Sequence, residues 1–197
     1  EAAAGGHLHR HGDRVQGALC GLACGSLCGF INGWLVAHMR LPPFIVTLGT
    51  WQVYNSIKYI YSKNETIRGQ DIEEQAPLLQ IFGSQLKVGG AVFTLGVIFM
   101  VVLVIFLWYV LNYTAWGRRL YAVGDDPDAA DLSGVPVKRM LVTTYTLSGF
   151  ICAIAGWVLI GRIGSVSPTS GEFANIESIT AVVIGGTSLS GGVGSIG

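Results

Sequence analysis

Long hydrophobic stretches alternate with short polar segments along most of this chain. The clearest stretch, residues 88–113, contains no charged side chain. A helix that crosses a bilayer needs about 20 mainly apolar residues, so this stretch predicts a transmembrane helix. Similar stretches predict further transmembrane or partly embedded helices at residues 16–37, 42–61, 140–161 and 174–189. The pattern thus predicts an all-α, polytopic helical membrane protein, with about five such helices in a partial transmembrane domain at residues 15–197.

The composition agrees with a membrane protein. Hydrophobic residues make up 51% of the chain and charged residues 12%, and the mean hydropathy is +0.54. A soluble core of this size could not bury so much apolar surface, so we expect membrane lipid around the chain and no nucleic acid partner. The formal net charge of zero adds nothing about partners.

Residues 1–14 differ from the rest of the chain because they are polar and lack a membrane pattern. We expect this segment to be a disordered tail. Its alternating histidines, His7, His9 and His11, could form a metal-binding tract. Nothing in the sequence fixes their geometry, so we assign no metal site.

A charged loop at residues 114–139 separates two of the predicted spans. Four basic side chains stand at its two ends: Arg118, Arg119, Lys138 and Arg139. Basic residues concentrate in the cytoplasmic loops of membrane proteins. We therefore expect this loop to be cytoplasmic and the preceding loop, residues 62–87, to be external.

The same loop contains the signals of a short helix. Asp125 or Asp126 is suited to the N-cap, Pro127 to the first turn and Gly134 to the end of the helix. The acidic side chains also favour the positive end of the helix dipole. The segment would form a compact cytoplasmic projection that either contacts a soluble partner or simply joins two spans as a solvated acidic turn.

Glycine recurs at every fourth position along the first predicted span, at Gly17, Gly21, Gly25, Gly29 and Gly33. In a membrane, such a face lets two helix backbones approach closely, so we predict a helix–helix seam there. Three cysteines repeat beside the glycines, at Cys20, Cys24 and Cys28. We interpret them as small packing residues, with no disulfide and no metal.

Three separated motifs carry a resemblance to a known family. They are GWLVA with PFIVTLGT at residues 33–37 and 43–50, GRRLYAVG through AADLSGV at residues 117–135, and IESITAVVIGGTSLSGGVGS at residues 176–195. In this order and spacing they resemble the permease subunits of bacterial ATP-binding-cassette (ABC) sugar importers, above all the ribose, xylose and fructose branch. Members of that family are longer, so the resemblance implies an incomplete chain.

The resemblance implies a multi-pass protein of the bacterial inner membrane that translocates a monosaccharide. The implied partners are cytoplasmic ABC ATPase subunits, a periplasmic sugar-binding protein and a second permease subunit that completes a homodimer. The sequence has no Gly-x-x-x-x-Gly-Lys-Ser/Thr motif. We therefore expect a transport subunit and not an enzyme, with no cofactor bound by this chain and ATP used by the partner subunit.

Two segments are candidates for coupling to the ATPase. The first comprises Gly117, Arg118, Tyr121, Gly124, Asp125, Pro127, Asp128, Ala130, Leu132 and Gly134. The second could either couple to the ATPase or bend a discontinuous helix. It comprises Glu177, Ala181, Gly185, Gly186, Gly191 and Gly192.

Polar side chains on the less apolar spans are candidates for the substrate path, although they could equally form hydrogen bonds between helices. They are Asn32, Thr47, Thr50, Gln52 and Asn55. Two alternative functions remain open at this point. An ion-coupled secondary transporter would need an ionisable residue at membrane depth, and a membrane-embedded metal-dependent enzyme would use the acidic residues at 125–131 as ligands.

Overall fold

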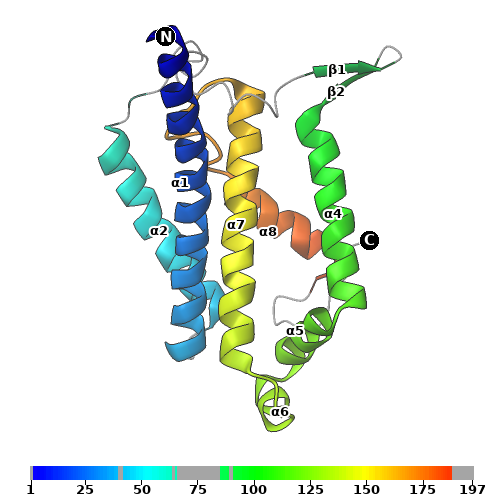
Figure 1. The fold of residues 1–197 in the computed structure, drawn as a ribbon. Helices are drawn as coiled ribbons and strands as arrows, with labels where there is room; N and C mark the ends of the chain where they lie inside the picture. The colour runs from blue at the N-terminus through cyan, green and yellow to red at the C-terminus, as the bar shows by residue number, and fades with distance from the viewer. Residues whose placement is uncertain (1, 40–41, 64, 66–84, 89–90, 188–197) are drawn as a thin grey trace.

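The computed structural model describes residues 2–39, 42–63, 65, 85–88 and 91–187. Within these ranges the chain forms seven helices and one two-stranded antiparallel sheet (Figure 1). The helices are α1 (Ala2–Met39), α2 (Pro43–Ser62), α4 (Leu95–Tyr113), α5 (Ala115–Asp125), α6 (Pro127–Leu132), α7 (Val137–Ile163) and α8 (Ala174–Ile184). The strands are β1 (Gln85–Val88) and β2 (Ala91–Thr94).

Three of these helices are long and apolar enough to cross a membrane, namely the Gln16–Met39 part of α1, α4 and α7. Helix α8 is apolar but has only 11 residues. Helix α2 has 20 residues and is less apolar, since it carries Gln52, Asn55 and Lys58. The prediction of an all-α, polytopic membrane protein is confirmed.

The N-terminal segment differs from the prediction of a disordered tail at residues 1–14. Helix α1 begins at Ala2, so residues 2–14 are helical in this structure. No proline interrupts this segment, and its three consecutive alanines are strong helix formers. A helix that is already nucleated in the apolar span extends into such a sequence at little cost.

The predicted span at residues 88–113 is also different, because its first part forms strand and not helix. Strand β2 pairs with β1 in an antiparallel register that joins Gln85 to Thr94 and Val88 to Ala91, and α4 begins only at Leu95. Valine and phenylalanine in β2 favour an extended backbone, so the paired strands shorten the apolar helix.

The arrangement of the helices is shown in Figure 1, where α1 and α7 lie side by side along most of their membrane-spanning length. Helices α2 and α4 stand on either side of this pair. Helices α5 and α6 lie at the end where α7 begins, and the β1–β2 hairpin lies at the opposite end. Helix α8 lies at about mid-height of α7.

The contact between α1 and α7 depends on glycine. A Cβ atom added at Gly25 would lie 2.5 Å from the Cβ of Ala153, and one added at Gly33 would lie 2.9 Å from the Cβ of Tyr145. A Cβ at Gly29 would collide with the backbone carbonyl oxygen of Tyr145. These glycines let the two backbones approach more closely than larger residues would allow.

The first two glycines of the stripe behave differently. A Cβ added at Gly17 or Gly21 would meet nothing within 4 Å. The close seam with α7 therefore occupies the later part of the glycine stripe, and the earlier part faces open space in the described structure.

Candidate functional site

A sharp turn connects the apolar helix α4 to the polar helix α5. The hydroxyl of Thr114 donates to the carbonyl of Val110 at 2.6 Å and accepts from the backbone N–H of Gly117 at 3.3 Å. Thr114 thus caps the start of α5. A Cβ at Gly117 would collide with the carbonyl group of Leu111, so the turn requires glycine at this position.

Helix α6 begins with the N-cap that its sequence predicts. The Asp126 carboxylate accepts from the backbone N–H groups of Asp128 and Ala129, both at 3.0 Å, and Pro127 occupies the first turn. Beyond the helix, Gly134 has a φ of +82°, in the left-handed region that glycine adopts without strain. Asp126, and not Asp125, is the cap.

A small hydrophobic cluster holds α5 and α6 against the start of α7. Val123, Ala130 and Met140 are 3%, 5% and 5% exposed, respectively. Partly buried hydrophobic side chains pack against them: Trp116, Leu120, Val135, Val137 and Leu141. The segment is therefore a packed projection with its own core.

The outer surface of this projection carries polar residues and one prominent apolar side chain. Leu132, the last residue of α6, is 91% exposed. Of the other predicted coupling residues, Ala130 and Gly117 are buried and Tyr121 and Gly124 are half-buried. The remainder are exposed: Arg118, Asp125, Pro127, Asp128 and Gly134. The projection thus presents acidic groups and a hydrophobic tip to its surroundings.

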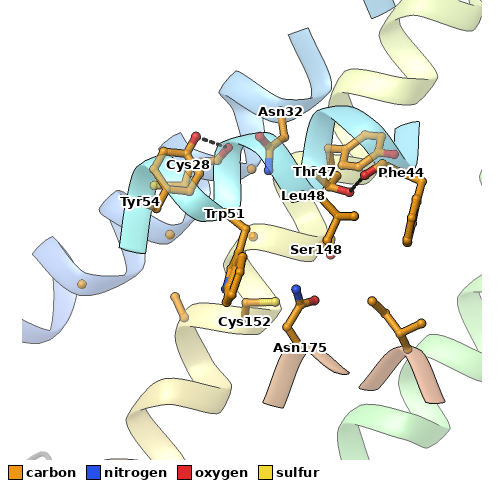
Figure 2. Close-up of a pocket in the computed structure, with 17 residues that line it drawn as sticks. Cys28, Asn32, Phe44, Thr47, Leu48, Trp51, Tyr54, Ser148, Cys152 and Asn175 are labelled. Atoms are coloured by element: carbon orange, nitrogen blue, oxygen red, sulfur yellow. Dashed lines mark hydrogen bonds between the residues drawn. The ribbon is translucent and has the colours of Figure 1, made fainter. Parts of the chain in front are cut away.

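A cavity of about 630 Å³ lies between α1, α2, α7 and α8. Figure 2 shows the side chains that line it, with one or more polar or aromatic groups from each helix. They include Asn32 of α1, Thr47, Trp51 and Tyr54 of α2, Ser148 and Cys152 of α7, and Asn175 of α8. The hydroxyl of Tyr54 donates to the carbonyl of Cys28 at 3.4 Å and so joins α2 to α1.

The cavity contains only part of the predicted substrate path. Asn32 and Thr47 line it, whereas Thr50, Gln52 and Asn55 do not. The Thr47 and Thr50 hydroxyls each donate to carbonyls of their own helix, with the shortest distance 3.0 Å in both cases. Ser and Thr hydroxyls on apolar helices commonly donate to backbone carbonyls of the preceding turn in this way.

The sequence alone did not single out Trp51, Ser148 and Asn175 as cavity residues. They belong to three different helices, α2, α7 and α8, and only the fold brings them to one cavity. The only available signal was polarity or aromaticity on an apolar helix, and this signal is common to many packing residues.

The second predicted coupling segment lies on and after α8. Glu177 and Ala181 are on this helix and are exposed. The helix ends at Ile184 with Gly185 as its C-cap, and Gly186 has a φ of +79°. Gly191 and Gly192 lie outside the described residues. The two glycines that are described therefore stop the helix.

Within the described ranges, no group of three or more His, Cys, Asp or Glu side chains gathers as a possible metal site. The four cysteines are all free thiols. The acidic residues of α6 include the helix cap Asp126, which already accepts two backbone hydrogen bonds.

Residues 15–196 match the family model described as "Branched-chain amino acid transport system / permease component". The chain belongs to this permease family. Its relatives include a fructose import permease of Rhizobium meliloti, which is 68% identical over 90% of this chain and 49% of its own length. A ribose import permease of Bacillus subtilis is 41% identical over 93% of this chain and 55% of its own length.

A ribose import permease of Escherichia coli is 34% identical over 89% of the chain and 53% of its own length. The chain thus spans about half the length of these curated permeases, between 49% and 55%. No solved structure gives a significant match.

Proposed function

We propose that this chain is part of the membrane-spanning permease subunit of an ABC importer that carries a monosaccharide across the bacterial inner membrane. Membership of the permease family over residues 15–196 supports a transport role. The substrate class follows from the relatives, whose names refer to fructose and ribose import. In this proposal the permease binds no cofactor, and ATP is used by a separate ATPase subunit.

The observation that carries the coupling role is the packed projection formed by α5 and α6. A segment that transmits movement between subunits must be rigid and must offer a contact surface. The projection has a buried core at Val123, Ala130 and Met140 and exposes Asp128 and Leu132. We propose that this projection docks on a cytoplasmic ATPase subunit.

The α8 segment supports a different role. In Figure 1 it lies at mid-height of α7, while α6 lies at the end of the molecule. A helix that stops inside the membrane requires protein or water around its free backbone groups. We propose that α8 and its terminal Gly185 and Gly186 belong to the transport path, as a discontinuous helix does.

The remaining partners complete the proposal. A periplasmic sugar-binding protein delivers the substrate, and a second permease subunit completes the channel as a homodimer. Helices α2 and α4 support such assembly because they expose many large apolar side chains, including Phe44, Ile60, Met100 and Ile105. Such surfaces contact lipid or other helices in a membrane.

Cysteine crosslinking at Asp128 tests the coupling role. The complete permease, with its other cysteines replaced by serine, carries Asp128→Cys and is co-expressed with the ATPase in inverted membrane vesicles. We expect a specific crosslink to the ATPase that changes with nucleotide. The matched control is Ser170→Cys in the segment between α7 and α8, which should form no crosslink. In Figure 1, α7 begins beside α6 and ends at the opposite end of the molecule.

The outcomes separate the parts of the proposal. Labelling of the Asp128→Cys thiol only from the periplasmic side would reverse the proposed orientation. If the thiol is labelled from the cytoplasm but never crosslinks to the ATPase, α6 does not carry the coupling role. A permease that supports no ATP-dependent sugar uptake would refute the import function itself.

A further inference from the structure

We propose that the cavity between α1, α2, α7 and α8 binds the monosaccharide during its passage, with Asn32 and Asn175 as hydrogen-bonding groups and Trp51 as an apolar face. This inference rests on the proposed import function. It adds the residues that contact the sugar inside the permease and distinguishes them from polar residues that only pack.

One wall of the cavity contains an unsatisfied hydrogen-bond acceptor. The side-chain oxygen of Asn32 is buried and has no hydrogen-bond partner, although the residue lines the cavity. Buried side-chain oxygens nearly always have a partner. A small turn of the amide towards the cavity brings this oxygen to a sugar hydroxyl, which can donate the missing hydrogen bond.

Several helices contribute polar side chains to the cavity. Asn32 comes from α1, Ser148 from α7 and Asn175 from the first turn of α8. No hydrogen bond within the described part of the chain engages the side chains of Ser148 or Asn175. Thr47 is different, because its hydroxyl is already bonded to the carbonyls of Pro43 and Phe44.

The cavity also has an aromatic surface. Trp51 of α2 lines the same cavity and is 37% exposed. Figure 2 shows its indole and the amide of Asn175 directed into the space between the helices. Small-molecule sites typically combine mainly apolar and aromatic walls with a few placed polar groups. The C–H face of a sugar ring fits the indole while its hydroxyls meet the amides.

The size of the cavity also fits a small polar ligand. Its volume of about 630 Å³ lies within the usual range of roughly 300–1,000 Å³ for ligand sites. Glycines create part of this space, and Gly21 is one of them. A Cβ at Gly21 would meet nothing within 4 Å, so a larger side chain there can enter the cavity without disturbing the α1–α7 seam.

A cavity-filling substitution is the first test. In the complete permease with its partners, Gly21→Leu should cause loss of D-fructose and D-ribose uptake while ATPase stimulation by the binding protein persists. Gly17→Leu is the matched control, because Gly17 is also unhindered but does not line the cavity. It should leave uptake unchanged. Equal uptake by both variants would overturn the proposal.

Cys152 provides a second, direct measurement, because this exposed thiol lines the cavity. With the other cysteines replaced by serine, the rate of modification by a small methanethiosulfonate reagent is measured with and without D-fructose or D-ribose. We expect the transported sugar to slow modification, whereas the same concentration of betaine should not. Modification at an unchanged rate, or a thiol that never reacts because another helix fills the cavity, would overturn the proposal.

Substitution of Asn175 connects this protection to a specific contact. In Asn175→Leu the half-protecting sugar concentration should rise roughly three- to tenfold, as expected for one lost neutral hydrogen bond. Asn175→Gln should restore part of the protection. An unchanged half-protecting concentration in Asn175→Leu would remove Asn175 from the site. Failure of the wild-type complex to import sugar would instead refute the proposed function.

Discussion

The backbones of Gly29 and Gly149 meet where α1 crosses α7. A Cβ atom added at Gly149 would lie 2.8 Å from the Cα of Gly29 and 3.0 Å from its backbone nitrogen. These short separations leave no room for a Cβ atom, so the residue type at both positions decides how closely the helices pack.

Substitution of Gly149 should therefore destabilise the permease. Gly149→Ala forces the two backbones apart, and overpacking of this kind costs about 1–3 kcal/mol. Gly156→Ala on the same helix is the control, because a Cβ there would meet nothing within 4 Å. It should be neutral or slightly stabilising, since alanine favours helix over glycine by about 0.5–1 kcal/mol. Thermal unfolding of both variants in one detergent would measure the difference, and equal melting temperatures would contradict it.

The N-cap of α6 gives a second prediction. Asp126→Ala removes the acceptor for the backbone N–H groups of Asp128 and Ala129 and should destabilise α6 by about 1 kcal/mol. Asp126→Asn should retain most of this stability, because asparagine is an equally good N-cap. Hydrogen exchange at those two amides is the measurement. Faster exchange in Asp126→Asn than in Asp126→Ala would show that capping is not the cause.

The exposed tip of α6 gives a third prediction. Leu132 is 91% exposed, so Leu132→Ser should leave the thermal stability of the permease unchanged. Loss of a central apolar contact should weaken ATPase binding by more than about 1 kcal/mol, or roughly fivefold or more. Phe173→Ser, at an exposed site near the start of α8, is the control and should bind the ATPase normally. Binding affinities can be measured on the permease in nanodiscs.

A fourth prediction concerns a contact between α2 and the segment before α8. The Tyr59 hydroxyl donates to a carboxylate oxygen of Glu172 at 3.5 Å. This distance is at the long limit for a hydrogen bond, so Tyr59→Phe should cost less than about 1 kcal/mol. Tyr61→Phe, at a side chain that is 90% exposed, should have no effect.

A double-mutant cycle with Glu172→Ala, which removes the acceptor, would isolate the pairwise energy. Additive effects of Tyr59→Phe and Glu172→Ala on thermal unfolding would show that the two side chains do not interact. Non-additive effects would assign them a joint role in holding α2 near α8.

Local signals in the sequence predicted several elements accurately. The proline at the start of α2, the cap and proline of α6, and the glycine after α6 act within one turn of the backbone, so short-range sterics and hydrogen bonding are sufficient to define them. The hairpin was missed because Val88 and the residues of β2 are as apolar as a membrane span. Hydropathy does not distinguish a short strand from the start of a helix.

The sequence by itself determined the membrane class, the main helices and the capped projection at α5–α6, because these depend on hydrophobic length and local backbone preference. Only the tertiary structure decided which glycines meet α7, and which polar side chains share a cavity. Gly17 and Gly29 have the same spacing pattern, yet only Gly29 contacts α7. Likewise, Asn32 and Asn175 line one cavity although 142 intervening residues separate them in the chain. Helix periodicity places the glycines on one face of α1, but the crossing with α7 decides which part of that face is covered.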